Sequence, residues 1–290
     1  MDWWTPLVSA LSPWMVALAP LPAPVDARTP WALASLWQLA QVAALPDACP
    51  GDMTLVDGYF CPDLPLTCAR PVDPINTYRC AEYVRDTRCR APVQLRRYCI
   101  DRHEWPNRVG EPPRVYVDWN EAKASCASVG KRLCRRTEWI FACEGEKRLP
   151  YSWGFVRQPS PCNIDRAVID FDINALVDPA ARDEELDRLW QGDPIGSHPD
   201  CRSPFGAFDM NGNVDEWTDD QADNPSSPHI STLNGAYWGK VRATCRITTT
   251  SHGPTFQFYQ VGFRCCDDTH DGLDVPPPPV TVLPKLVTPN

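Results

Sequence analysis

The feature that most limits what this chain can fold into is its set of fourteen cysteines within 290 residues. An even, dense set of cysteines is typical of proteins that fold in an oxidising compartment and are held together by disulfides. Zinc binding is the rival use of cysteine, but structural zinc sites need ligand pairs of the C-x-x-C type. The only close pair here is Cys265-Cys266, and adjacent residues rarely chelate one ion together. The cysteines therefore predict a disulfide-rich protein that is secreted or lies in the periplasm or cell envelope.

The cysteines also divide the chain into three regions. Residues 1–48 are apolar, rich in proline and free of cysteine, and residues 49–268 hold every cysteine, with a Cys-rich N-terminal part at 49–99. Residues 269–290 contain a run of four prolines and two later ones, which is typical of a disordered tail. We expect one folded domain, residues 49–268, between two segments of different character.

The first region fits an export signal only in part. Trp3–Leu21 is apolar and Val25-Asp26-Ala27 resembles a cleavage site, but no Lys or Arg precedes the apolar run. Three prolines within that run disfavour a retained membrane anchor, so we expect no transmembrane span after processing. Residues 1–48 are thus predicted to be a signal peptide or, alternatively, an N-terminal apolar helical segment that stays on the protein.

Net charge restricts the partners. The formal net charge is −9 at neutral pH, whereas nucleic-acid binding requires a basic face that neutralises phosphates. We therefore expect no nucleic-acid partner.

The local patterns predict an α+β fold with much irregular backbone. Asp118 and Glu121 form a potential capping box, which places a helix at Trp119–Val129 before Gly130. Further patterns predict helices at Arg136–Cys143 and Pro179–Trp190, the latter with Asp178 as its cap, and short strands at Val115–Val117, Asn234–Trp238 and Thr244–Thr250.

Eight short motifs occur in the same order as in a known family. They are Gly51–Phe60 (G-D-M-T-L-V-D-G-Y-F), Tyr98–Asn107 (Y-C-I-D-R-H-E-W-P-N), Val117–Ala122 (V-D-W-N-E-A) with Cys126, Gly130–Cys134 (G-K-R-L-C) with Glu138-Trp139, Pro150–Gly154 (P-Y-S-W-G), Phe205–Trp217 (F-G-A-F-D-M-N-G-N-V-D-E-W), Asn234–Trp238 (N-G-A-Y-W) and Gly262–Arg264 (G-F-R). Each is weak alone, but together the eight motifs, in register over residues 51–266, resemble the formylglycine-generating enzyme, or sulfatase-modifying factor, family.

The resemblance implies a compact, irregular α+β domain related to the C-type lectin fold. It also implies bound calcium and, in the best-known members, a copper-dependent oxidation by oxygen that converts a sulfatase cysteine to formylglycine. Other relatives catalyse different oxygen-dependent steps, and some only bind ligands. Fold is therefore better supported than chemistry.

Calcium is the cofactor that the residues support best. The loop from Asp209 to Glu216 is rich in Gly and Asn and is flanked by carboxylates, and calcium prefers six to eight oxygen ligands of such kinds. By resemblance, the ligands are the side chains of Asp209 and Glu216 and the carbonyls of Gly212 and Val214. A second calcium site of the family begins at the motif that matches Asn163-Ile164, and its later ligands fall in a divergent acidic segment.

The copper site of the family is not matched. That site uses two cysteine thiolates, which select Cu(I), between the motif ending at Trp238 and the next disulfide cysteine, Cys245. The interval is shortened here, and Gly239 and Lys240 stand nearest to the two ligand positions. We therefore expect copper to be absent.

The disulfide pairing is also implied by the resemblance. In vertebrate-type members of the family the corresponding cysteines pair as Cys126–Cys265 and Cys143–Cys245. Cys134–Cys266 and Cys162–Cys201 are further guesses, and the six cysteines from Cys49 to Cys99 are left to pair among themselves in any of fifteen ways.

Two functions remain open after this reading. The first is a non-catalytic binding or structural module, exported and directed at a protein or glycan ligand of the cell envelope. The second is an oxygen-dependent oxidase that converts a sulfatase cysteine to formylglycine. The missing copper cysteines favour the first.

Overall fold

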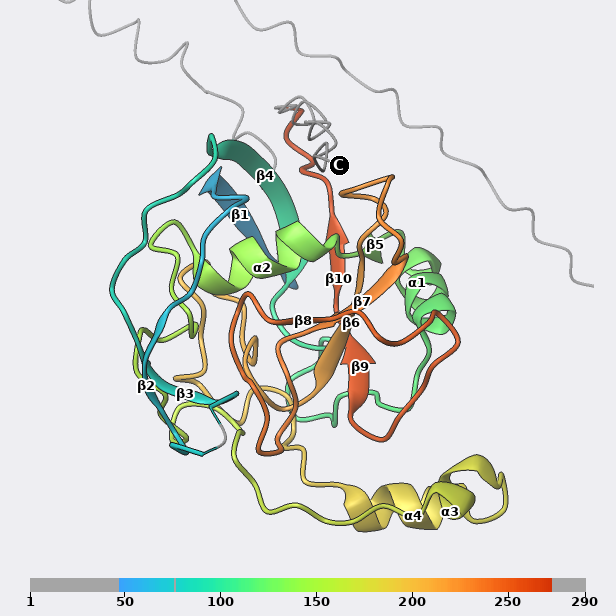
Figure 1. Cartoon of the computed structure of the whole chain (residues 1–290). Coiled ribbons are helices and arrows are strands. Elements are labelled where there is room, and N and C mark those ends of the chain that lie inside the picture. Colours follow the sequence, from blue (N-terminus) through green and yellow to red (C-terminus); the bar gives the residue numbers. More distant parts are fainter. Residues whose placement is uncertain (1–46, 76, 273–290) are drawn as a thin grey trace, which may run out of the picture. The chain divides into compact units, whose positions relative to one another are not determined.

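The computed structural model describes residues 47–75 and 77–272 (Figure 1). The expected signal or helical segment, residues 1–48, and the Pro-rich tail, residues 269–290, lie almost wholly outside the described residues. None of the helices in the described ranges is long and apolar enough to cross a bilayer.

Three small sheets and four helices make up the described part of the chain. One four-stranded sheet has the order β1-β4-β10-β5, a second has the order β8-β7-β6-β9, and β2 pairs with β3 alone. The strands are β1 Met53–Phe60, β2 Cys68–Pro71, β3 Cys80–Tyr83, β4 Gln94–Asp101, β5 Arg132–Leu133, β6 Asp215–Asp219, β7 Ser231–Asn234, β8 Thr248–Thr249, β9 Val261–Phe263 and β10 Cys265–Asp267. The helices are α1 Trp119–Ser128, α2 Arg136–Glu144, α3 Ile173–Val177 and α4 Arg182–Leu189.

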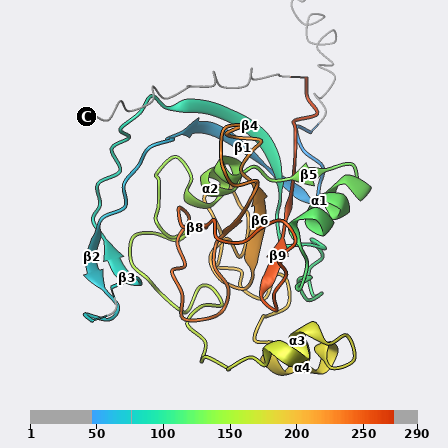
Figure 2. The same cartoon turned by 45° about the vertical axis from the view of Figure 1, so that its right-hand side comes forward.

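Helix α2 lies between the two four-stranded sheets, where it contacts β1 as well as β6 and β7 (Figures 1 and 2). Its side chains Trp139 and Phe141 are fully buried and belong to a core cluster with Phe60, Ile100 and Met210. This packing fixes the start of β6 against the sheet that contains β4. Both ends of the calcium loop expected at residues 209–216 are therefore held by core residues rather than left on a free surface.

Helix α1 confirms the local prediction at its N-terminus. Asp118 accepts a hydrogen bond from the backbone amide of Glu121, and the Glu121 carboxylate accepts one from the amide of Asp118, which completes the capping box. Trp119, Ala122 and Cys126 are buried, whereas Val129, the last residue of the predicted helix, follows the last helical residue and is 51% exposed.

Three other element predictions were wrong in their bounds or their existence. Val115–Val117 is not a strand, because Tyr116 has a left-handed backbone conformation with φ 55° that interrupts an extended run. The strand expected at Asn234–Trp238 is β7, which ends at Asn234, since Gly235 and Ala236 both have positive φ. Only Thr248–Thr249 of the strand expected at Thr244–Thr250 is extended and paired, because the amide of Cys245 bonds to Pro150 in a loop.

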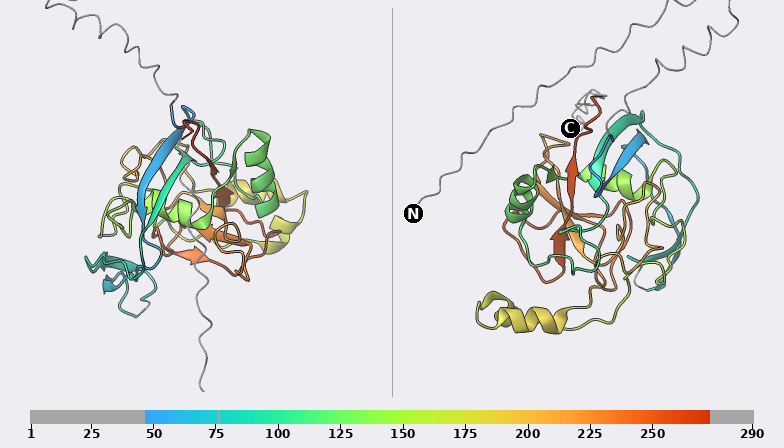
Figure 3. Two further views of the ribbon diagram at one scale, coloured as in Figure 1. Left: turned by 90° about the horizontal axis from the view of Figure 1, so that it is seen from above. Right: turned by 180° about the vertical axis from the view of Figure 1, so that it is seen from behind.

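The helix expected at Pro179–Trp190 is shorter and does not use its expected cap. Helix α4 starts at Arg182 after Ala181, and Asp178 instead accepts a hydrogen bond from the amide of Ala180 within a turn. The unexpected helix α3 precedes it, with Asp172 accepting hydrogen bonds from the first-turn amides. These two helices occupy one long excursion between α2 and β6 (Figure 3).

Candidate functional site

The expected calcium ligand Glu216 is engaged by an arginine. Its carboxylate is fully buried and accepts hydrogen bonds from Nε and Nη2 of Arg264, each at 2.6 Å, and from the indole nitrogen of Trp139 at 2.7 Å. Arg264 is itself fully buried and also donates to the carbonyl of Phe208 at 2.8 Å. A bidentate pair of this kind is strong and directional, so both Glu216 oxygens already have a cationic partner.

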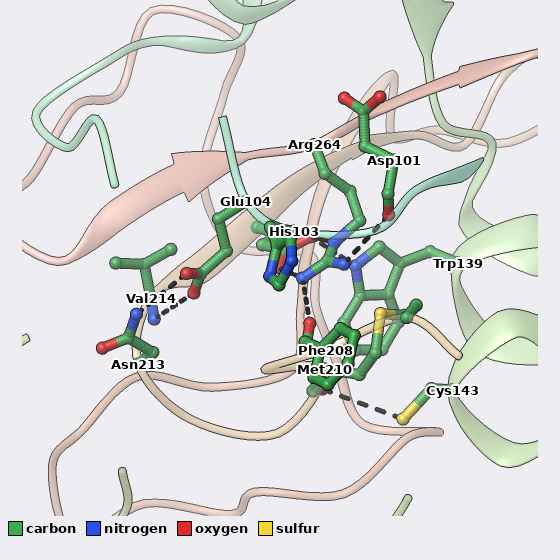
Figure 4. A network of polar contacts seen from close by, with 12 residues as sticks. Asp101, His103, Glu104, Trp139, Cys143, Phe208, Met210, Asn213, Val214 and Arg264 are labelled. Atoms are coloured by element: carbon green, nitrogen blue, oxygen red, sulfur yellow. Dashed lines mark hydrogen bonds and ion pairs between the residues drawn. The ribbon is translucent and has the colours of Figure 1, made fainter. Parts of the chain in front are cut away.

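Two more carboxyl groups, those of Glu104 and Asp209, interact electrostatically with Arg264, and Figure 4 shows Glu104 beside Asn213 and Val214. Glu104 accepts hydrogen bonds from the Asn213 side chain at 2.8 Å and the Val214 amide at 3.2 Å, and burial with nearby Asp209 and Glu216 raises its pKa well above the usual range. Asp209 is 2% exposed, and burial raises its pKa to about 7 against the attraction of Arg264 and His198. Its Oδ1 atom has no hydrogen-bond partner within the described structure.

Gly212, one of the expected calcium ligands, lies beside Asn163-Ile164, the start of the second expected calcium site. Gly212 has φ 96°, and a Cβ atom there would lie 2.3 Å from the carbonyl oxygen of Asn163. The same carbonyl accepts a hydrogen bond from the Asn213 amide at 3.0 Å, and Ile164 is buried against this contact. The structure therefore brings Asn163, Ile164 and Gly212 together, although the two motifs are far apart in sequence.

Arg166 donates a hydrogen bond to the side-chain oxygen of Asn163, an atom that could otherwise bind a metal ion. Nε of Arg166 donates to Asn163 Oδ1 at 2.7 Å, and its Nη2 lies 2.9 Å from the carboxylate of Asp193. The Asn163 amide nitrogen donates to the Gln191 carbonyl at 2.8 Å. The polar atoms of Asn163 are therefore satisfied by the protein itself.

These contacts do not fit the calcium ligand set that the resemblance implies. Calcium needs several free oxygens at short range, but Arg264 and Trp139 occupy Glu216, and Arg166 occupies the Asn163 side chain. Among the residues described, no group of three or more His, Cys, Asp or Glu side chains is arranged to hold a metal ion. The buried Oδ1 atom of Asp209 has no hydrogen-bond partner among the described residues. Calcium binding stays a prediction of the resemblance.

All fourteen cysteines lie in the described residues, and all are in disulfides. The bonds include Cys126–Cys265 and Cys143–Cys245, the two pairs implied by the resemblance, together with the guessed pairs Cys134–Cys266 and Cys162–Cys201. The six N-terminal cysteines pair among themselves as Cys49–Cys99, Cys61–Cys89 and Cys68–Cys80. No cysteine remains free, so the donor set does not fit a copper site built on thiolates.

A surface pocket of about 160 Å³ lies where the interval from Trp238 to Cys245 folds back on the second sheet. Backbone and side chains from β6, β7, β8 and the loop between β7 and β8 form its walls, and Tyr78 closes one edge from the connection between β2 and β3. The lining residues are Tyr78, Asp215, Leu233, Gly235, Ala236, Val241, Arg242, Ile247 and Thr249.

Strand alternation points two neighbouring acids of β6 to opposite faces. Glu216 faces Arg264 in the core, whereas Asp215 lies on the pocket wall and is partly exposed. Burial in that wall raises the pKa of Asp215 to about 7, while the Ala236 amide and Arg242 oppose the shift. The pocket thus carries a carboxyl group that changes charge near neutral pH.

Arg242 and Tyr78 supply the other polar groups of the pocket. The Arg242 side chain is exposed and makes no ion pair with any described residue. Tyr78 donates its hydroxyl hydrogen to the Lys240 carbonyl at 2.8 Å, which ties the β2–β3 connection to the loop that follows Trp238. The edge of the pocket is therefore formed by two segments more than 150 residues apart in the sequence, joined by this hydrogen bond.

Asp215, Arg242 and Tyr78 were not predicted as a group. No local pattern brings them together, because the walls of the pocket are joined by long-range contacts such as that of Tyr78 with Lys240.

Comparisons with known proteins agree with the motifs. The family described as "Sulfatase-modifying factor enzyme 1-like domain" matches residues 74–269. The chain is 32% identical over 162 residues to the "Inactive C-alpha-formylglycine-generating enzyme 2" of Bos taurus, covering 53% of this chain and 50% of the relative. It is 28% identical over 254 residues to the "Formylglycine-generating enzyme" of Mycobacterium tuberculosis, covering 78% of this chain and 75% of the relative. The chain spans about half the length of the mammalian relatives that it matches.

A solved structure described as CarF aligns with a TM-score of 0.49 and 16% identity, over 76% of this chain and 98% of that one.

Proposed function

Because this chain belongs to the sulfatase-modifying factor enzyme 1-like family but keeps every cysteine in a disulfide, we propose that it is a non-catalytic binding module of that family. The proposal rests on the interval from Trp238 to Cys245, which contains no free cysteine. Its only cysteine, Cys245, is bonded to Cys143 and is fully buried. A thiolate-copper oxidase needs two free sulfur ligands in this region, and the chain offers none.

The relatives support the same reading. The cattle protein and a mouse protein, each 32% identical to this chain, are both described as inactive formylglycine-generating enzymes. A fold can persist after its chemistry is lost, because stability and catalysis depend on different residues. Here the two disulfides implied by the family, Cys126–Cys265 and Cys143–Cys245, are kept while the thiolates are not.

We further propose that the protein works outside the cytoplasm. The described part of the chain contains seven disulfides, and disulfides persist in oxidising compartments. The proposed partner is a protein or glycan of the cell envelope that presents a small group to the pocket at Asp215 and Arg242.

The test combines a thiol count with an activity assay on the same protein. Native chain, purified without reductant and then denatured, is titrated with a thiol reagent, and we expect no reactive thiol. The same preparation is incubated with Cu(I), oxygen and a Cys-x-Pro-x-Arg peptide, and peptide mass is followed. Unchanged peptide supports the proposal. Conversion of the peptide cysteine to formylglycine overturns it and restores the oxidase reading.

A further inference from the structure

The pocket beside β6 has walls of two kinds. Leu233, Ala236, Val241 and Ile247 give it an apolar lining, and the remaining side chains on it are Tyr78, Asp215, Arg242 and Thr249. A surface pocket of about 160 Å³ with apolar and charged side chains in its walls has room for a small molecule.

The two charged groups of the pocket have opposite signs and are not paired with each other. Neither Asp215 nor Arg242 forms an ion pair with a described residue. The carboxyl of Asp215 is met by the Ala236 amide alone, and the guanidinium of Arg242 reaches it only through the longer-range Coulomb attraction. Both charges are thus free to meet complementary groups on a ligand.

A ligand with one charge satisfies only half of this arrangement. An amine would pair with Asp215 but meet the positive potential of Arg242, and a carboxylate would pair with Arg242 but meet Asp215. A small molecule that carries both an ammonium and a carboxylate group pairs with both, and an aliphatic part suits the walls formed by Leu233 and Ile247.

We propose that this pocket binds a small zwitterion of the α-amino-acid class, with its ammonium group on Asp215 and its carboxylate on Arg242. The inference rests on the proposed function, because it assigns a ligand to the binding site of a non-catalytic module. Tyr78, whose hydroxyl is held by the Lys240 carbonyl, fixes the edge of the pocket over the ligand.

The experiment measures binding of L-valine to the full chain by isothermal titration calorimetry, beside two analogues that each lack one charge. Isobutylamine has no carboxylate, and N-acetyl-L-valine has no ammonium group. We expect saturable one-site binding of L-valine and at least about tenfold weaker binding of each analogue, since a charge-assisted hydrogen bond is lost.

Two pocket variants assign the charges. Asp215→Asn is expected to weaken L-valine binding about tenfold and to remove the preference over N-acetyl-L-valine. Arg242→Gln is expected to weaken it by a similar factor and to remove the preference over isobutylamine. Asp200→Asn and Arg90→Gln are matched controls, because both side chains are exposed and lie outside the pocket, and both should bind L-valine as the wild type does.

The outcomes separate this inference from the function on which it rests. Absence of saturable L-valine binding, or binding that neither pocket variant weakens although both variants melt cooperatively, overturns the zwitterion proposal. Equal binding of L-valine and isobutylamine overturns it as well, since Arg242 then has no role. Oxidation of a cysteine peptide overturns the non-catalytic function instead, whatever the result with L-valine.

Discussion

At the scale of single residues, the buried carboxyl of Asp209 links the stability of the fold to pH. Its folded-state pKa is about 7, compared with an ordinary value of 3.8, and burial is the main cause. Between these two values the folded chain binds the proton more tightly than the unfolded chain does. The free energy of unfolding therefore falls as the pH rises through this window, and above pH 7 the full cost of the buried charge is present.

Substitution of Asp209 by Asn should remove this cost without changing the shape of the side chain. We expect the variant to match the wild type near pH 4 and to exceed its free energy of unfolding at pH 8 by on the order of 1–3 kcal/mol. Denaturant unfolding at the two pH values measures the difference. A variant that is less stable than the wild type at pH 8 would mean that the ionised carboxylate has a partner, such as a bound cation.

Arg264 is the residue on which the buried charges depend most. It pairs with Glu216 and lies near Glu104 and Asp209, all three buried. Replacement of Arg264 by Met leaves the Glu216 carboxylate buried without a cation, and loss of one partner of a buried pair costs about 3–5 kcal/mol. We expect a large loss of stability in denaturant unfolding, whereas Arg90→Gln at the surface should have little effect. A loss below about 1 kcal/mol, the size expected for an exposed ion pair, would contradict this prediction.

At the scale of the elements, the disulfides connect segments that the short strands cannot hold alone. Cys126 on α1 is bonded to Cys265 at the start of β10, 139 residues later. Cys68–Cys80 joins β2 to β3 across only 12 residues. A disulfide that closes a longer loop restricts the unfolded chain more strongly.

The two bonds can be compared directly. The chain-entropy relation gives about 5 kcal/mol for the Cys126–Cys265 bond and about 3 kcal/mol for Cys68–Cys80. We expect the Cys126→Ala, Cys265→Ala double variant to lose more stability than the Cys68→Ala, Cys80→Ala variant, since it also opens a cavity in a buried cluster. Thermal unfolding of both variants checks the order, and the reverse order would contradict it.

The loop at residues 209–216 gives a separate prediction for calcium. Because arginine and tryptophan engage Glu216, and Arg166 engages Asn163, we expect a chelator to leave the melting temperature unchanged. A ligand that binds only the folded state raises the free energy of unfolding by an amount that grows with the logarithm of its concentration relative to its dissociation constant. A fall of several degrees on chelation, reversed by added calcium, would show a calcium site that these contacts do not predict.

At the scale of the whole molecule, the sequence predicts some levels of structure far better than others. The α1 capping box is local, and Asp118 and Glu121 carry it without help from the rest of the chain. The strands at 115–117 and 244–250 were wrong because positive φ at Tyr116 and pairing of the Cys245 amide with Pro150 are set by tertiary contacts. The pocket at Asp215 lay beyond local reasoning for the same reason, since Tyr78 reaches it from a distant hairpin.

The family motifs supplied the pairing of Cys126 with Cys265 and of Cys143 with Cys245, which local patterns could not. The α+β class, the irregular backbone and the motif order agree with the family match at residues 74–269. The assignment of Glu216 as a calcium ligand came from the motif alone, and the motif could not show that the arginine of Gly262-Phe263-Arg264 folds back onto that carboxylate. The chemistry of this site thus depends on contacts between motifs rather than on any one of them.

The chain belongs to the sulfatase-modifying factor enzyme 1-like family, and none of its cysteines is free to bind copper as a thiolate. The most direct test is a competition titration of Cu(I) between a chromogenic chelator and the native protein, purified without reductant so that all seven disulfides stay intact. We predict that the chelator keeps all the copper, because no thiolate is available to withdraw it. Withdrawal of one equivalent of Cu(I) by the native protein would contradict this account.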